Sequence, residues 1–326
     1  MPARRTPGEL PLDATTESTS MTTELCQLDI FSERPPAKIR APRGIKPIQG
    51  ASALATPAKQ NGLVGMFDTI SVMRKNSHKP IVFADFYCGS GVNAVNGEEI
   101  NGSPISMLEG IYLSCQRMKG PPAQQRYIVF NDIVSDRVLD ALPIAVESWQ
   151  ARNRLPVDRN ILRCTTKDGI PVSIPITYVA SPAQELCNSI DGLIRGGAHV
   201  VALVDPNGPK DAPWEALKRM FRAKERALEL IIHVSSNTLK RVSRAREATG
   251  FNFSPMPNHV QDMLAAFTGC GGWIREPVGS DQWTMLLLSK FPPYGGWNCK
   301  NGPRFLLIDS TEGSSLIRRL STTRSR

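Results

Sequence analysis

Two acidic residues follow apolar, strand-like runs that lie far apart in the chain. The first run ends at Asp85, and Gly89 and Gly91 follow within a short loop. The second run, His199–Val204, leads directly into Asp205. Uninterrupted apolar runs of this length are typical of strands buried in a parallel sheet, where ligands bind at the carboxyl ends of the strands. The pattern therefore predicts an open α/β sheet with a ligand crevice along that edge.

A third acid, Asp132, closes another apolar run at residues 127–130. A carboxylate at this place can accept the two hydroxyls of a ribose, although an acid at a helix entrance can also simply stabilise the helix dipole. Asp132 lies more than 40 residues beyond Gly91, whereas the dinucleotide fingerprint expects roughly 20. No GxxxxGK[ST] phosphate loop is present. The ligand thus has a ribose and needs no pyrophosphate cradle, a description that S-adenosylmethionine satisfies.

The segment Asp205-Pro206-Asn207-Gly208 is the candidate for the chemical step. Pro206 stiffens the turn and favours an extended conformation for Asp205. Fixed acceptors on Asp205, Pro206 and Asn207 can hold an amino group and orient its lone pair towards an electrophilic methyl group. In-line methyl transfer mostly needs such positioning and desolvation. A plain Pro-rich turn between a strand and a helix is the structural alternative.

Four short motifs, in order, carry a resemblance to a known superfamily. They are Asp85-Phe86-Tyr87-Cys88-Gly89-Ser90-Gly91, Gly102-Ser103-Pro104 with Leu108-Glu109, Asn131-Asp132, and Asp205-Pro206-Asn207-Gly208. With these motifs, residues 80–310 resemble the class I S-adenosylmethionine-dependent methyltransferases, and within them most resemble the three-Cys-motif partner proteins. The resemblance implies a doubly wound, mostly parallel sheet of seven strands whose last strand is antiparallel.

The resemblance also implies roles for individual residues. It places the methyl donor against Asp85, Cys88, Gly89 and Gly91, its ribose at Asp132 and its adenine near Ser181. The methyl acceptor then lies at residues 205–207. In amino-methyltransferases that act on nucleic acid, the fourth motif often ends in an aromatic residue that stacks on the flipped base. Gly208 occupies that position here, which argues against base methylation.

Other aromatic residues are candidates to compensate for the missing stacking group. Residues 283–289 and 304–309 read as a final hairpin whose turn carries Tyr294 and Trp297. Because the first of these strands is expected to run parallel to the others, this turn should emerge at the ligand edge, where either ring can stack on an extruded base. Local packing of both rings is the alternative. Trp214 either packs its helix on the sheet or lines the acceptor site.

The net charge of the chain indicates what kind of partner it binds. The net charge is +9 and the isoelectric point is near 9.3, a balance that favours an acidic partner such as nucleic acid. Lys240, Arg241 and Arg244 follow the fifth strand and are candidates for phosphate contacts, with a solvated basic face as the alternative. The family name further implies a separate cysteine-motif partner protein.

Composition excludes other classes of protein. The seven cysteines form no CxxC pair, so neither a zinc site nor a disulfide framework is expected. No metal constellation is expected from the histidines either. No apolar stretch reaches the roughly 20 residues of a membrane span, and residues near the N-terminus do not form a secretory signal. These features favour a cytoplasmic protein.

Alternating strand-like and helix-like segments predict an α/β domain between two polar ends. We expect a disordered arm at 1–60, a methyltransferase-like domain at 61–320 and a frayed tail at 321–326. Ser103 and Ser181 are expected to cap helices, the latter in a capping box. Predicted strands lie at 81–85, 127–130, 176–180, 199–204, 228–234, 283–289 and 304–309, with an edge hairpin at 161–176 and a helix at 258–267.

The sequence therefore predicts an S-adenosylmethionine-dependent methyltransferase that acts on an amino group in nucleic acid. Two alternatives remain open at this point. One is a non-catalytic or partner-dependent binding module of the same fold, and the other is a methyltransferase for a small molecule. The predicted site requires Asp132 and Asp205 to lie at one shared edge of the sheet.

Overall fold

The structure is a computed structural model. It describes residues 51–95, 98–206, 212–224, 227–235, 271–276, 283–289, 297–298 and 304–321, all within one unit, 36–326. Several predictions fall outside these residues: most of the N-terminal arm, the tail beyond Ser321, the helix at 258–267, and the candidate residues Asn207, Lys240, Arg241, Arg244 and Tyr294.

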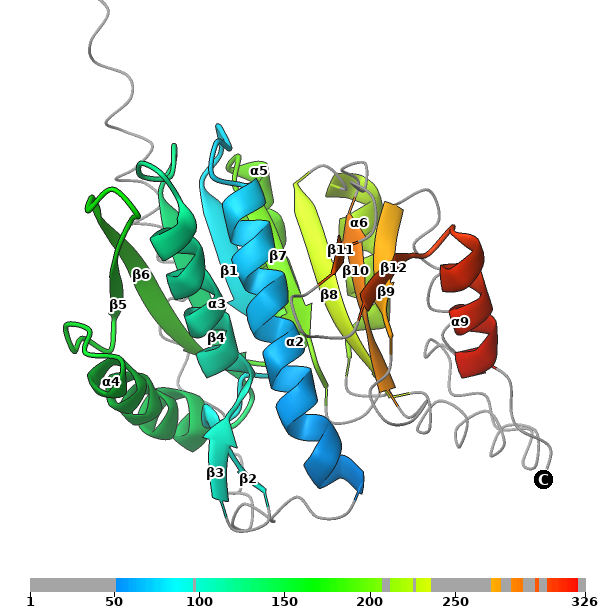
Figure 1. Cartoon of the computed structure of the whole chain (residues 1–326), viewed down its shortest axis with the longest axis horizontal. Coiled ribbons are helices and arrows are strands. Elements are labelled where there is room, and N and C mark those ends of the chain that lie inside the picture. The colour runs from blue at the N-terminus through cyan, green and yellow to red at the C-terminus, as the bar shows by residue number, and fades with distance from the viewer. Residues whose placement is uncertain are drawn as a thin grey trace, which may run out of the picture. The chain divides into compact units, whose positions relative to one another are not determined.

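Five parallel strands form the centre of the main sheet (Figure 1). They are β1 (Ile81–Asp85), β4 (Arg126–Asp132), β6 (Pro171–Ala180), β7 (His199–Val204) and β8 (Leu228–Ser235), in the spatial order β6-β4-β1-β7-β8. Every residue of β1 and of β7 is buried. This burial explains their unbroken apolar sequences and confirms the predicted α/β architecture with a parallel centre.

The sheet is wider than the seven strands predicted, because it contains ten among the described residues. On one side β5 (Ile161–Thr165) pairs antiparallel with β6, as the predicted edge hairpin requires. On the other side β10 (Trp283–Ser289) runs antiparallel to β8 and is followed by β9 (Gly271–Arg275), β12 (Arg304–Leu307) and β11 (Trp297–Asn298). The strand count is therefore a correction to the prediction.

The predicted hairpin between residues 283–289 and 304–309 is wrong. Strand β12 pairs with β9, and β9 lies between β12 and β10. Strand β9 begins with Gly271 and Gly272, and glycine has a low strand propensity, so its sequence gave no strand signal. The segment β2 (Val92–Val95) and β3 (Glu98–Asn101) forms a second small sheet that was not predicted either.

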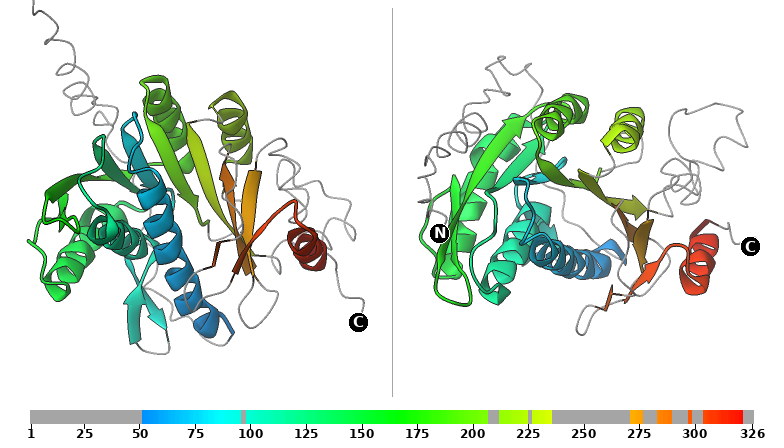
Figure 2. Two further views of the ribbon diagram at one scale, coloured as in Figure 1. Left: turned by 45° about the horizontal axis from the view of Figure 1, so that its top comes forward. Right: turned by 90° about the horizontal axis from the view of Figure 1, so that it is seen from above.

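Helices cover both faces of the sheet (Figure 2). On one face lie α2 (Ala51–Met73) and α3 (Ser103–Arg117), while α5 (Ala183–Arg195) and α6 (Trp214–Lys224) lie on the other. A π-helix, η1 (Asp136–Ala141), leads into α4 (Leu142–Arg152), which contacts α3. The last element is α9 (Thr311–Ser321).

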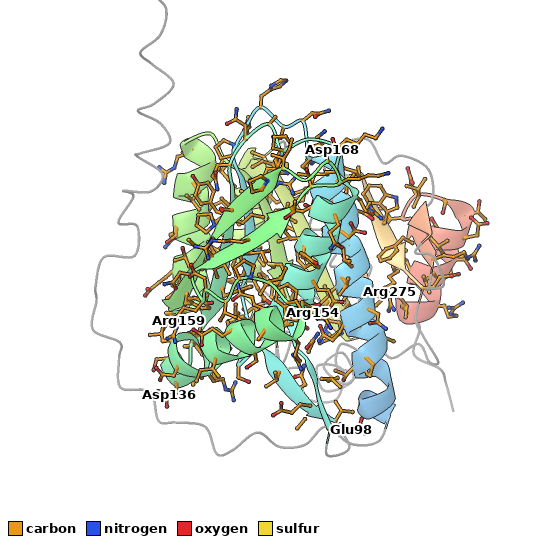
Figure 3. The ribbon with its side chains drawn as sticks, turned by 60° about the vertical axis from the view of Figure 1, so that its left-hand side comes forward. Glu98, Asp136, Arg154, Arg159, Asp168 and Arg275 are labelled. Atoms are coloured by element: carbon orange, nitrogen blue, oxygen red, sulfur yellow. The ribbon has the colours of Figure 1, made fainter. Side chains whose placement is uncertain are left out.

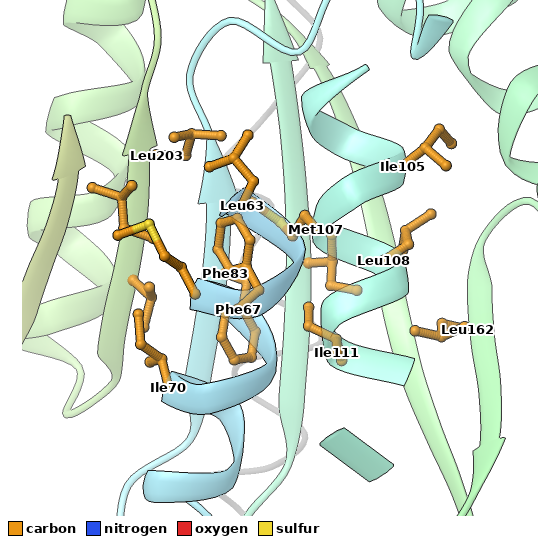
Figure 4. Close-up of a cluster of buried hydrophobic side chains, with 14 of the residues drawn as sticks. Leu63, Phe67, Ile70, Phe83, Ile105, Met107, Leu108, Ile111, Leu162 and Leu203 are labelled. Carbon is orange, nitrogen blue, oxygen red and sulfur yellow. The ribbon is translucent and has the colours of Figure 1, made fainter. Parts of the chain in front are cut away.

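Helix α2 corrects the predicted boundary of the N-terminal arm, since it begins at Ala51 rather than after residue 60. The helix contains Pro57 and its sequence resembles a loop, so packing rather than propensity stabilises it. It lies so close to α3 that a Cβ atom on Gly110 would be 2.5 Å from the carbonyl oxygen of Val64. Figure 4 shows the apolar side chains that α2, α3 and β1 bury together, among them Leu63, Phe67 and Phe83.

The predicted helix caps differ in detail from the structure. Gly102, not Ser103, is the N-cap of α3, and Pro182 is the N-cap of α5. Neither N-cap residue makes a side-chain cap hydrogen bond. Ser181 instead directs its hydroxyl to Asn131, because its side chain bonds across the sheet edge rather than back to its own helix.

The connections diverge between β1 and β7. The chain leaves β1 for α3 and β4 on one side, then returns after β6 through α5 to β7 on the other side of β1. The helices after β1 and after β7 lie on opposite faces of the sheet (Figure 2). Such a point of divergence is where open α/β sheets bind ligands, at the carboxyl ends of the strands.

Candidate functional site

Three carboxylates gather at this carboxyl edge, as the sequence predicts. Asp85 and Asp132 are the last residues of β1 and β4, and Asp205 directly follows β7. The two outer strands flank β1, with Phe130 and Leu203 in register with Asp85. The charges of Asp205 and Asp132 both raise the pKa of Asp85. The three acids are therefore close enough to interact although they are widely separated in sequence.

Asp85 is the most deeply buried of the three, with 0% of its surface exposed. Burial raises its pKa to about 7, and the charges of the other two acids add to this effect, while hydrogen bonding from Ser103 and from the Tyr87 backbone opposes it. Its Oδ1 accepts the Tyr87 N–H at 3.1 Å. Its Oδ2 is buried and has no hydrogen-bond partner in the described part of the chain. A buried, unsatisfied acceptor is uncommon and calls for an explanation such as a ligand.

The loop after β1 leaves space beside its backbone. Gly89 has φ +60° and Gly91 has φ +82°, a region that glycine adopts without strain. A Cβ atom added to Gly89 would meet no atom within 4 Å, whereas one added to Gly91 would be 2.6 Å from Cδ1 of Leu142. Gly89 is thus the residue whose backbone is open to an approaching molecule, and Gly91 is needed for packing.

Asp132 holds this loop in place. Its Oδ2 accepts the Gly89 backbone N–H at 3.0 Å, and its Oδ1 accepts the Val134 N–H at 2.8 Å. An ionised carboxylate offers about four acceptor positions, so two remain for further donors. Asp132 consequently has a structural role in addition to the ribose contact predicted for it.

Asn131 is part of a motif named above, but the sequence assigned it no role of its own. Its Nδ2 donates to the carbonyl oxygens of Phe86 and Ser181, both at 3.1 Å, and its Oδ1 accepts the Ser181 hydroxyl at 2.9 Å. Asn131 is 1% exposed and connects the loop after β1 to the turn after β6. A polar residue at the end of an otherwise apolar strand was the available signal.

Cys88 lies in the same loop, and its backbone N–H donates to the carbonyl oxygen of Asn131 at 2.9 Å. Burial raises the pKa of its thiol well above the usual value, and the charges of Asp85 and Asp132 raise it further. Because the thiolate is the reactive form of cysteine, this thiol is unsuited to nucleophilic chemistry.

Both oxygens of Asp205 are engaged by cationic or ionisable side chains. Oδ2 lies 2.8 Å from Nζ of Lys59, and Oδ1 lies 2.8 Å from Nδ1 of His233. Burial alone would raise the pKa of Asp205, but the charges and hydrogen bonds of Lys59 and His233 outweigh it and hold the pKa far below its usual range. Asp205 therefore stays ionised. No local pattern indicates these contacts, since Lys59 lies 146 positions away.

The aromatic candidates lie elsewhere. Strand β10 is antiparallel to β8, so the chain leaves β10 at the edge opposite the acids, and the premise that this strand runs parallel is wrong. Trp297 belongs to β11, five strands from β7 in the sheet, and the structure does not bring it to the acids. Trp214 is 3% exposed, which agrees with the packing alternative. Their contacts with a substrate stay predictions.

Helix α6 carries several Lys and Arg residues, and the structure describes only some of their side chains. Lys218 pairs with Glu215 at 3.0 Å on an exposed helix face. Within the described ranges, no group of three or more His, Cys, Asp or Glu residues has the arrangement of a metal site. No described helix is long and apolar enough to cross a membrane.

Comparison with known proteins gives little further information. No protein-family model matches the sequence, and no curated protein matches it. Solved structures similar to it include a Legionella pneumophila protein of the DUF519 family, with a TM-score of 0.44, 10% identity, and 84% of this chain and 93% of that chain covered.

Two further structures are similar at a lower level. A DUF574 family protein from Streptomyces avermitilis has a TM-score of 0.39 and 12% identity, covering 74% of this chain and 86% of that chain. A candidate class I S-adenosylmethionine-dependent methyltransferase from Listeria monocytogenes has a TM-score of 0.32 and 9% identity, covering 84% of this chain and 73% of that chain. All three TM-scores are below 0.5, too low to establish a shared activity.

Proposed function

We propose that this protein binds S-adenosylmethionine at the carboxyl edge of β1, β4 and β7 and transfers a methyl group to an amino group in nucleic acid. The observation that carries the proposal is the buried Oδ2 of Asp85, which lacks a partner in the described chain, on a carboxyl group that the charges of Asp132 and Asp205 reach. Asp85 and Asp132 favour a cationic group beside them and disfavour a phosphate there. A nucleoside with a sulfonium and an ammonium group fits this edge, and a pyrophosphate does not.

The residues at the edge have complementary roles in binding the donor. Oδ2 of Asp85 would accept a hydrogen bond from the donor's ammonium group, and the backbone at Gly89 has open space beside it. The two remaining acceptor positions of Asp132 suit the two hydroxyls of a ribose. Ser181, held against Asn131, lies at the turn assigned to the adenine. When bound, S-adenosylmethionine supplies an activated methyl group.

Asp205 is the group proposed to orient the acceptor. Its carboxylate stays ionised, so it can accept a hydrogen bond from an amino group and direct the nitrogen lone pair away from itself. Pro206 and Asn207 follow it and would supply further acceptors. The net charge of +9 supports a polyanionic acceptor, for which Lys240, Arg241 and Arg244 are the proposed phosphate contacts.

Isothermal titration with S-adenosylmethionine tests the donor site. We expect wild type to bind one equivalent, Asp85→Asn to bind at least about tenfold more weakly, and Asp140→Asn, a control at an exposed residue of the π-helix, to bind like wild type. Titration with NAD⁺ should give no heat, because its pyrophosphate would meet the acids. Wild type that binds NAD⁺ and not S-adenosylmethionine would overturn the proposal.

Transfer is tested separately, with radiolabelled donor and pooled DNA or RNA as acceptors. Transfer of label to either pool by wild type, and its loss in Asp205→Ala, would support the proposed methyltransferase activity.

A specific observation favours a second candidate, a binding module that needs a partner, because Lys59 and His233 occupy both oxygens of Asp205. Donor binding without transfer to either pool or to small amines, with transfer appearing when a separate cysteine-motif protein is added, would establish this second candidate.

A further inference from the structure

Lys59 occupies the oxygen that an acceptor amine would need. Its Nζ is 2.8 Å from Oδ2 of Asp205, and His233 holds the other oxygen. The side chains of Lys59 and Asp205 remain 20% and 10% exposed, so part of each is in contact with solvent. A buried pair elsewhere in the fold, His199 with Glu229, has only 3% exposure on each side. The Lys59–Asp205 pair is therefore more exposed to solvent than the buried His199–Glu229 pair.

Hydrogen bonds hold the segment on both sides of Lys59, one through the Ala58 backbone and one through the Gln60 side chain. The carbonyl oxygen of Ala58 accepts a hydrogen bond from Nη2 of Arg275 at 2.9 Å, and Oε1 of Gln60 accepts one from the Ser106 hydroxyl at 2.9 Å. Arg275 and Ser106 are 0% and 1% exposed, and Figure 3 shows Arg275 beside α2. Because α2 is anchored here, the flexible four-carbon side chain of Lys59 is the part that can leave Asp205.

The charge balance decides which molecules can move this side chain. A neutral amino group that displaces Lys59 forms one hydrogen bond to Asp205. The displaced ammonium group of Lys59 is then left without its carboxylate. A phosphate next to the amino group supplies a new anionic partner for that ammonium. Only an acceptor that carries both groups can therefore exchange the Lys59–Asp205 pair for two new favourable contacts.

We propose that Lys59 is a specificity-determining residue, which yields Oδ2 of Asp205 to the acceptor only when an acceptor phosphate takes up its charge. The proposal rests on the proposed methyl transfer to nucleic acid and adds how that substrate class is chosen over free nucleosides. Specificity of this kind comes from a cost imposed on the wrong substrate. Lys59 imposes that cost on neutral amines.

The test compares two acceptors across three variants. The acceptors are a mixed-sequence single-stranded oligonucleotide, as DNA and as RNA, and the corresponding free nucleosides. For Lys59→Met we expect the ratio of kcat/KM for oligonucleotide over nucleoside to fall at least about tenfold, mainly because nucleosides become better substrates. Lys59→Arg should keep the wild-type ratio. Lys79→Met removes an exposed lysine just before β1 and should leave the ratio unchanged.

A second measurement does not depend on catalysis. Oligonucleotide binding is measured against salt concentration without donor, and Lys59→Met should reduce the slope of log K against log salt by about 1, the loss of one phosphate contact. An unchanged slope together with an unchanged acceptor ratio would overturn the role of Lys59 while leaving the methyltransferase proposal intact. Equal loss of transfer to both acceptors with a lowered unfolding midpoint would identify Lys59 as structural and likewise overturn it. Failure of wild type to bind S-adenosylmethionine, or to methylate either acceptor, would overturn both proposals.

Discussion

Oδ2 of Asp132 accepts the backbone N–H of Gly89 at 3.0 Å and so joins the end of β4 to the loop after β1. The contact makes Asp132 both a shape-determining residue of the glycine loop and the proposed acceptor for the donor's ribose. Because a second oxygen holds the Val134 N–H, the carboxylate has a fixed orientation before any ligand arrives.

Removal of this carboxylate should weaken donor binding. Hydrogen bonds to a charged group are each worth about 1.5–3 kcal/mol, so loss of the two proposed ribose contacts in Asp132→Ala should weaken S-adenosylmethionine binding by at least about 100-fold, measured by calorimetry. Asp132→Asn should also bind weakly, because its amide NH₂ would face a backbone N–H. Asp140→Ala, which removes an exposed acid, is the control. Wild-type affinity in Asp132→Ala would exclude this residue from the donor site.

Asp85 should make the protein less stable as pH rises. Its folded pKa is about 7, above the ordinary 3.8 of the unfolded chain. Below pH 4 both states are protonated and Asp85 has no cost. Between pH 4 and pH 7 the unfolded state ionises first, so stability falls, and above pH 7 the full cost remains, at most about 4 kcal/mol.

An isosteric variant isolates this effect. Asp85→Asn has no charge at any pH, so it should be more stable than wild type at pH 8 and about equal to it below pH 4. Urea unfolding at pH 4, 6 and 8 without donor measures the difference. A stability difference that does not vary with pH would show that the folded pKa of Asp85 is not raised.

The opposite end of the sheet should be sensitive to loss of one acid. Oε1 of Glu229 lies 3.0 Å from Nε2 of His199 and accepts the Nε–H of Arg74 at 2.7 Å, which ties the chain after α2 to β7 and β8. Burial would raise the pKa of Glu229, but His199 and Arg74 outweigh it and lower the pKa. This contribution is present above the ordinary pKa of a glutamate and is lost as pH falls through the lowered one.

Glu229→Ala should cost roughly 3–5 kcal/mol of unfolding free energy at pH 7, because it leaves Arg74 and the buried His199 without the acceptor they share. Glu215→Ala breaks an exposed pair with Lys218 and should cost at most about 1 kcal/mol. Urea denaturation of both variants makes the comparison. Similar small losses in the two variants would show that the buried network contributes no more than a surface pair.

The two glycines of the loop should respond differently to a methyl group. Gly89→Ala meets no atom and should cost only its left-handed conformation, about 1–2 kcal/mol. Gly91→Ala carries the same conformational cost and also places its Cβ atom 2.6 Å from Leu142 and 3.0 Å from Ala145, so overpacking adds about 1–3 kcal/mol. Thermal unfolding should rank Gly91→Ala below Gly89→Ala, and the reverse order would contradict the loop geometry.

Local sequence was sufficient for the central strands. The buried runs at β1 and β7, the acids that end or follow them, and the edge hairpin of β5 and β6 were all predicted in place. Burial on both faces of a parallel strand leaves an unbroken apolar signature, and the carboxyl ends of such strands meet at one edge. The gathering of Asp85, Asp132 and Asp205 follows from these two facts.

The pairing of strands that do not follow each other in the sequence leaves no such apolar signature. Strand β9 begins with two glycines, and β12 pairs with it rather than with β10, so the predicted hairpin failed. The sequence of α2 resembled a loop, since contact with α3 stabilises this helix rather than its own periodicity.

By itself, then, the sequence determined which strands are buried, which acids stand at their ends and that these acids share an edge. Only the tertiary structure decided what surrounds Asp205. Lys59 comes from a helix whose sequence predicted a disordered arm, and His233 comes from the end of β8. Ion pairs between distant segments have no periodicity and no fixed spacing, because each depends on how the whole chain packs. Folding places both side chains on one carboxylate.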